Sequence, residues 1–262
     1  DAAINALTAN AGENFTLTVT DRVGATASRV LAVNIQATND TPTLKASPDS
    51  TSFIDNAGDD NFVPVTGQLS GSDRDAGSSL SYSLQGAASD NARSGYDLSK
   101  SGRFGTLYLN STTGAYTYVP NDAAIEGQSA GTTAQDDFVF EVSDGSLSQT
   151  TGFTATIVGA GDPPVWSDGD DSVALIESNS TLTASGNLTL TDNDLSDAVA
   201  LSKTVAVSTS TPLPLPDTTT LLGMLGISPT RLLDDATSTS ASVSWVFNSG
   251  SEYFNNLPAG ET

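Results

Sequence analysis

Two pairs of aspartates, each separated by one residue, stand in the same sequence context at two places in the chain. Asp73 and Asp75 close the segment Gly67-Gln-Leu-Ser-Gly-Ser-Asp-Arg-Asp75, and Asp192 and Asp194 close Gly186-Asn-Leu-Thr-Leu-Thr-Asp-Asn-Asp194. In such a turn the first and third side chains can point to one side and hold a cation between them. The recurrence predicts a carboxylate site for a hard ion such as Ca2+, which takes about six to eight oxygen ligands.

Two further kinds of acid precede each pair at matching positions. One follows a strand-like segment, and the other lies in a linker. We therefore predict two calcium sites at repeat boundaries. Their ligands are Asp21, Asn39, Asp40, Asp73 and Asp75 at the first boundary, and Asp144, Asp162, Asp192 and Asp194 at the second. The alternative is that Asp is frequent here because it favours turns and helix caps. Against that alternative, several carboxylates close to one boundary repel one another when no cation is present.

The composition excludes several classes of chemistry. The 262 residues include 31 Asp and Glu against 9 Lys and Arg, giving a net charge of −22, and there is neither His nor Cys. Disulfides, thiolate nucleophiles and imidazole-based catalysis are therefore absent. The strong negative charge predicts no binding to nucleic acid, since phosphate backbones would be repelled. No apolar run approaches the roughly 20 residues that cross a bilayer, so we expect no membrane insertion.

Alternating apolar and polar residues, bounded by Gly, Asn, Asp and Ser, predict half-buried β-strands along most of the chain. One stretch, 218–225, instead favours a short helix after a Pro-rich segment. The predicted fold is all-β, built from tandem sandwiches. The expected strands are 15–20, 30–35, 80–84, 105–109, 115–119, 138–142, 153–158, 188–190 and 243–247.

Internal matches place these strands in a repeat of roughly 120 residues. Phe15-Thr-Leu-Thr-Val-Thr-Asp21 aligns with Phe138-Val-Phe-Glu-Val-Ser-Asp144, and Phe53-Ile-Asp55 resembles Leu175-Ile-Glu177. We predict that residues 1–40 are the C-terminal strands of a first repeat and that 41–162 form a complete sandwich. Residues 163–262 would then form a third repeat lacking its last strands, with an insertion at 208–240.

Several segments resemble a known family of bacterial repeats. Gly71-Ser-Asp-Arg-Asp-Ala-Gly-Ser-Ser-Leu-Ser-Tyr-Ser-Leu84 is similar to a segment of cadherin-like domains, and Phe104-Gly-Thr-Leu-Tyr-Leu with Thr113-Gly-Ala-Tyr-Thr-Tyr-Val-Pro120 resembles the VCBS-type repeat. The resemblance implies Ig- or cadherin-like β-sandwiches in a large secreted bacterial protein, often an RTX-type adhesin at the cell surface. It also implies that Ca2+ rigidifies the boundaries between repeats. The second linker has Gly161 where Asn is usual, which predicts a weaker site there.

The leading functional prediction is a calcium-rigidified structural segment of an extracellular adhesin or filament, whose partners are neighbouring repeats or copies of itself. Because the chain begins and ends at nearly the same phase of its repeat, residues 1–40 of one copy could complete the third unit of the next. The alternative is a piece of one longer chain.

A second possible function is a calcium-dependent module that binds surface glycans. The side chains that could stack on sugars are Trp166, Trp245, Tyr108, Tyr116 and Tyr118. Tyr116, Tyr118 and Trp245 stand at alternating strand positions, which favours packing over sugar binding. We expect no enzymatic activity, because a sandwich of this size rarely builds a deep catalytic cleft.

Overall fold

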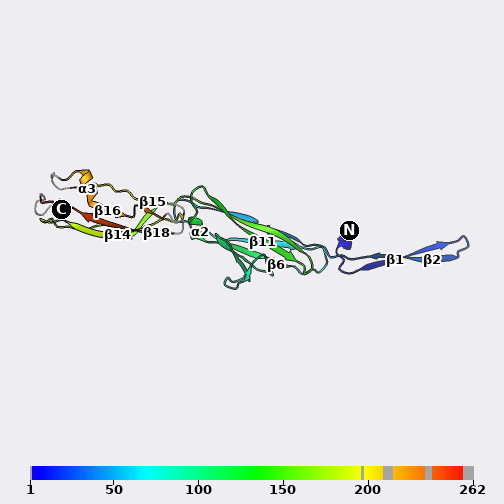
Figure 1. The fold of residues 1–262 in the computed structure, drawn as a ribbon. Coiled ribbons are helices and arrows are strands. Elements are labelled where there is room, and N and C mark those ends of the chain that lie inside the picture. Colours follow the sequence, from blue (N-terminus) through cyan, green and yellow to red (C-terminus); the bar gives the residue numbers. More distant parts are fainter. Residues whose placement is uncertain (1, 196–197, 209–214, 234–237, 256–262) are drawn as a thin grey trace. The chain divides into compact units, whose positions relative to one another are not determined.

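The computed structural model describes residues 2–195, 198–208, 215–233 and 238–255. The chain divides into two compact units (Figure 1). Unit 1 comprises residues 1–53, 61–122 and 134–157, and unit 2 comprises residues 54–60, 123–133 and 158–262. No helix in the described part of the chain is long and apolar enough to cross a bilayer.

Unit 1 begins with a short helix and a two-stranded hairpin. Helix α1 spans Ala2–Asn5, and strand β1 (Ala11–Thr20) pairs antiparallel with β2 (Thr26–Ile35) along its whole length. Residues opposite one another on antiparallel strands point to the same face, so Phe15 and Leu31 share one face of this hairpin. The hairpin is a sheet of its own, drawn in blue in Figure 1.

The rest of unit 1 is a sandwich of two sheets. The larger sheet has the strand order β3-β5-β10-β9-β8-β7, and the smaller has the order β4-β12-β11-β6. The strands of the larger sheet are β3 (Thr43–Ser47), β5 (Val65–Ser72), β7 (Ala88–Ser89), β8 (Leu98–Ser101), β9 (Gly105–Leu109) and β10 (Ala115–Pro120). Those of the smaller sheet are β4 (Ser50–Ile54), β6 (Ser81–Leu84), β11 (Thr133–Ser143) and β12 (Ser148–Val158).

Aromatic side chains from both sheets fill the space between them. Tyr116 of β10 lies 4.9 Å, between ring centroids, from Phe140 of β11 and 5.7 Å from Phe153 of β12. Tyr118 packs in the same way against Phe138 and Phe153. All five rings are at most 2% exposed. The central strands β11 and β12 of the smaller sheet therefore supply much of this core.

Unit 2 contains one four-stranded sheet with the order β13-β14-β18-β16, together with a two-stranded pair of β15 and β17. A small core of Leu190, Leu232, Leu233 and Val243 covers part of one face of the larger sheet. The elements are α2 (Asp122–Glu126), β13 (Val165–Gly169), β14 (Thr183–Thr191), β15 (Val199–Ala200), α3 (Thr218–Met224), β16 (Leu225–Ser228), β17 (Arg231–Leu232) and β18 (Ser240–Asn248).

The all-β sandwich prediction is confirmed, and each strand expected from the sequence overlaps an observed strand. The short helix expected at 218–225 is α3, whose N-cap Asp217 accepts a bond from the Thr220 N–H. Residues 209–214 and 234–237 of the predicted insertion 208–240 lie outside the described residues. The C-terminal segment 256–262 lies outside them as well.

Candidate metal centres in two acidic clusters

The D-x-D pairs and the linker aspartates form two clusters with the same local geometry. In the first, the Asp75 N–H donates to Asp73 at 2.7 Å, and the Asp40 N–H donates to Asp75 at 2.8 Å. In the second, the Asp194 N–H donates to Asp192 at 3.0 Å, and the Asp162 N–H donates to Asp194 at 2.6 Å. The loop after β5 and the loop after β14 thus hold their acids against a linker in the same way.

The structure assigns Asp144 to the first cluster rather than the second, which corrects the sequence-based grouping. Asp144 lies in the turn between β11 and β12, and its Oδ2 accepts from the Asn39 side-chain amide at 2.8 Å. The whole of strand β12, which is 11 residues long, lies between Asp144 and Asp162. The turn of a hairpin and the linker that follows it lie at opposite ends of a strand.

For the same reason, Asp21 is not brought to the first cluster. It lies in the turn of the β1–β2 hairpin, where its Oδ1 accepts from the N–H groups of Val23 and Ala25. The strand β2 of 10 residues separates it from Asn39 and Asp40. The first cluster as observed contains Asn39, Asp40, Asp73, Asp75 and Asp144.

The second cluster gains acids that sequence reasoning missed. Asp55, directly after β4, accepts from the Ala160 N–H at 3.1 Å, two residues before Asp162. Glu126, at the end of α2, accepts from the Asp60 N–H at 3.1 Å. Carboxylate oxygens of Asp55, Asp60 and Glu126 lie within 4.8 Å of one another. The sequence does contain a signal for Asp55, because Phe53-Ile-Asp55 matches Leu175-Ile-Glu177 and both segments end in an acid. Glu126 belongs to no recurring motif, so the sequence does not indicate it as a ligand.

Both clusters contain buried carboxylate oxygens that accept no hydrogen bond. They are Oδ2 of Asp73 and Oδ1 of Asp75 in the first cluster, and Oδ1 of Asp55, Oε2 of Glu126 and both oxygens of Asp162 in the second. A buried carboxylate without a partner is costly, because it loses its hydration without compensation. Every buried charged residue in the described part of the chain is acidic. Oxygen-rich, cation-poor sites of this kind fit a hard divalent ion such as Ca2+.

Crowding of like charges is visible in the ionisation of the second cluster. Burial, followed by the Asp55 and Asp162 carboxylates, raises the pKa of Glu126 to about 7, against a partial offset from the Asp60 N–H. Burial and then the Asp55 carboxylate also raise the pKa of Asp162, which the nearby Asn193 side chain opposes in part. In the first cluster the Leu147 N–H and the Asn39 amide lower the pKa of Asp144. Burial and neighbouring carboxylates therefore disfavour the ionised forms of Glu126 and Asp162 in the second cluster.

Two of the tyrosines considered for glycan stacking are not available at the surface, whereas the third, Tyr108, is half-buried. Tyr116 and Tyr118 are fully buried in the sandwich core, as their alternating positions predict. Burial raises the pKa of Tyr116 to about 12, with a further contribution from Asp49.

Comparisons with known proteins leave the family open. No protein-family model matches the sequence, and no curated protein matches it either. Among solved structures, the chain overlaps protocadherin gammaB3 (EC1-4) with 9% identity and a TM-score of 0.33, covering 91% of this chain and 57% of the other. It overlaps a protocadherin gammaB7 EC3-6 cis-dimer structure with 13% identity and a TM-score of 0.32, covering 89% of this chain and 57% of the other.

An endo-fucoidan hydrolase, MfFcnA4 of glycoside hydrolase family 107, overlaps with 18% identity and a TM-score of 0.28, covering 91% of this chain and 29% of the other. Overlaps this loose define neither a family nor an activity. The sandwich fold rests on the strand pairing described above, and the resemblance to VCBS-type repeats stays a prediction.

Proposed function

We propose that the chain is a calcium-binding structural segment of a secreted or surface-exposed bacterial protein, in which Ca2+ stiffens the connections between sandwich repeats. The observation that carries this proposal is the set of buried carboxylate oxygens without hydrogen-bond donors in both acidic clusters. Two clusters with the same loop-to-linker hydrogen bonds support it, because a chance accumulation of turn-forming aspartates would not repeat this geometry.

In the first cluster we propose Asp40, Asp73 and Asp75 as carboxylate ligands, with Asn39 and Asp144 at its edge. In the second we propose Asp55, Asp60, Glu126 and Asp162, together with the D-x-D residues Asp192 and Asp194. A bound Ca2+ would supply the positive charge that the buried acids lack. The acids of each cluster come from separate segments, namely a linker, a loop and strand ends. An ion between them would therefore tie those segments together and restrict their motion.

We propose that the second cluster binds Ca2+ more tightly than the first, although Gly161 replaces the linker Asn there. More carboxylates raise calcium affinity, and the observed second cluster adds Asp55, Asp60 and Glu126. Among the described residues, the Asn39 side-chain amide donates hydrogen bonds to Asp144 and to the Asp40 carbonyl, so the absence of an Asn counterpart removes little from the second site. Affinities of extracellular calcium modules, about 10⁻⁴–10⁻³ M, suit such a role outside the cell.

Thermal unfolding with calcium or with EDTA tests this proposal. At about 100 times the Kd, one bound ion adds about 2.7 kcal/mol to the free energy of unfolding, so calcium should raise the Tm of the wild type by several degrees. Asp162→Asn should remove the part of this increase that belongs to unit 2. Asp137→Asn is the matched control, since Asp137 lies on β11 outside both clusters and bonds only Thr154 in the described contacts. A Tm that is the same in calcium and EDTA would refute the proposal.

A further inference from the structure

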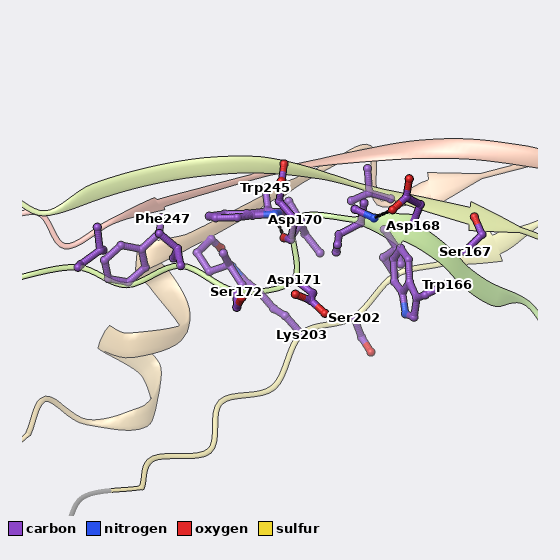
Figure 2. Close-up of a pocket in the computed structure, with 18 residues that line it drawn as sticks. Trp166, Ser167, Asp168, Asp170, Asp171, Ser172, Ser202, Lys203, Trp245 and Phe247 are labelled. Carbon is purple, nitrogen blue, oxygen red and sulfur yellow. Dashed lines mark hydrogen bonds between the residues drawn. The ribbon is translucent and has the colours of Figure 1, made fainter. Parts of the chain in front are cut away.

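Unit 2 contains an open hydrophobic groove on one face of its larger sheet. Its cavity of about 960 Å³ is lined by Leu188, Leu225, Ile227, Trp245 and Phe247, all half-buried. Figure 2 shows Trp166, Trp245 and Phe247 lining this hollow together with Asp171 and Lys203. An apolar sheet face left open to water is unfavourable and marks a surface that another element covers.

The sandwich of unit 1 shows what occupies the equivalent place. The order β13-β14-β18-β16 repeats the order β3-β5-β10-β9. The registers also agree, because Gly186 pairs with Trp245 as Gly67 pairs with Tyr116. The groove floor therefore corresponds to Leu69, Leu107, Leu109, Tyr116 and Tyr118, which are at most 2% exposed. In unit 1 the β11–β12 hairpin buries these residues with Phe138, Phe140 and Phe153.

The strands that flank this hairpin in unit 1 also have counterparts at the groove. In the smaller sheet, β4 and β6 stand on either side of β12 and β11. Segment 173–177 corresponds to β4 by sequence but forms no strand, and Leu175 is 38% exposed where Phe53 is 6% exposed. Strand β15 follows the second D-x-D pair as β6 follows the first, and it pairs only with β17 in the described structure. The described residues of unit 2 thus supply the edges of a second sheet without its two central strands.

The β1–β2 hairpin has the sequence that would fit. Its Phe15, Leu17 and Val19 align with Phe138, Phe140 and Val142 of β11. The aligned residues of β11 are at most 2% exposed, whereas Phe15, Leu17 and Val19 are 48%, 61% and 70% exposed. On β2, Leu31 takes the place of Phe153 and is 52% exposed. One face of this hairpin is therefore a core surface without a partner.

We propose that the β1–β2 hairpin of a second copy of this chain docks in the groove of unit 2 and completes its sandwich. The hairpin, residues 11–35, has a net charge of zero, whereas the whole chain has a net charge of −22. Its charged residues are Glu13, Asp21, Arg22 and Arg29. Two copies would repel one another over most of their surface, and this neutral segment is where close approach costs least. Arg29 shares the face of Leu17, and the groove offers Asp168, Asp170 and Asp171.

Cross-linking between two single-cysteine variants tests this docking, since the natural chain has no Cys. In unit 1, Phe153 lies 5.9 Å from Tyr118 between ring centroids, and their counterparts are Leu31 and Phe247. The Leu31→Cys variant is therefore mixed with an affinity-tagged Phe247→Cys variant, and a short bismaleimide is added to join the two thiols. Salt at about 150 mM screens the repulsion between the two acidic chains. We expect a covalent heterodimer whose yield rises with concentration. Val30→Cys is the matched control, because Val30 is 58% exposed but lies on the opposite face of β2.

Docking predicts several-fold less heterodimer with Val30→Cys than with Leu31→Cys. Equal yields from the two hairpin positions would overturn the proposal, as would a chain that stays monomeric in sedimentation at all concentrations. A cross-link formed only within single molecules of a Leu31→Cys/Phe247→Cys double variant would also overturn it, because the occupant would then be the same chain. The named groove and hairpin residues are not proposed calcium ligands, so we expect the heterodimer in EDTA as well. Failure of docking and failure of calcium binding are therefore separate results.

Discussion

The sandwich of unit 1 and the open sheet of unit 2 share a strand order but differ in how completely they are covered. Tyr116 and Tyr118 are fully buried in unit 1, whereas their counterparts Trp245 and Phe247 line a groove. The acidic clusters nevertheless keep the same linker-to-loop hydrogen bonds in both. The difference shows that the carboxylate geometry depends on the loop and linker sequences and does not require a completed core.

Truncation of equivalent residues in the covered and uncovered hairpins gives the largest expected contrast. Phe153→Ala removes a fully buried ring and should lower the free energy of unfolding of unit 1 by about 3–5 kcal/mol. Leu31→Ala, at the aligned position in β2, should cost less than about 1 kcal/mol in dilute protein, because Leu31 is 52% exposed.

Chemical denaturation can separate the two units in this test. Both tryptophans, Trp166 and Trp245, belong to unit 2, and every tyrosine except Tyr253 belongs to unit 1. The tyrosine near-UV signal should report the loss in Phe153→Ala while the tryptophan fluorescence transition stays in place. Equal losses in Phe153→Ala and Leu31→Ala would mean that the β1–β2 hairpin is already packed in the single chain.

A pair of glycines tests the same contrast on a smaller scale. A Cβ added at Gly67 would lie 2.2 Å from the Tyr116 ring, and one at Gly186 would lie 2.7 Å from the Trp245 ring. The Tyr116 ring is enclosed on all sides, so Gly67→Ala should cost about 1–3 kcal/mol through overpacking. A Cβ at Gly186 would also lie 2.7 Å from the Cβ of Asp170. Both Asp170 and the Trp245 ring line the open groove and can shift into it, so Gly186→Ala should cost less than Gly67→Ala in denaturant unfolding. A larger loss in Gly186→Ala would show that the groove does not give this freedom.

The smallest expected effect is a pH dependence of unit 2 without calcium. The pKa of Glu126 is about 7 in the folded chain and lies near its ordinary value when unfolded. The folded state therefore holds the extra proton between these values, and stability falls as pH rises through that window and levels off above about 7. In EDTA, the tryptophan-monitored Tm should be a few degrees lower at pH 8 than at pH 5.5, and Glu126→Gln should reduce this difference. A Tm that rises over this range would contradict the crowding of the second cluster.

Much of the fold could be predicted from the sequence, because buried and more exposed residues alternate along strands such as β11 and β12. The D-x-D pairs and linker acids were also predictable, since they are local and repeat in register. The positions of Asp21 and Asp144 were not, because an antiparallel hairpin carries its turn a full strand length from the next linker. Asp55, Asp60 and Glu126 meet only through folding, and no local spacing indicates that their carboxylates converge.

Calcium titration of the full chain by calorimetry, in buffer stripped of divalent ions, tests the central claim most directly. We predict saturable binding at calcium concentrations up to the millimolar range, with more than one site. Asp75→Asn and Asp162→Asn should each remove a different part of the isotherm, the tighter part being lost with Asp162→Asn, while Asp137→Asn leaves the isotherm unchanged. Absence of saturable heat in the wild type, or equal losses from Asp137→Asn and Asp162→Asn, would contradict the assignment of these clusters to Ca2+.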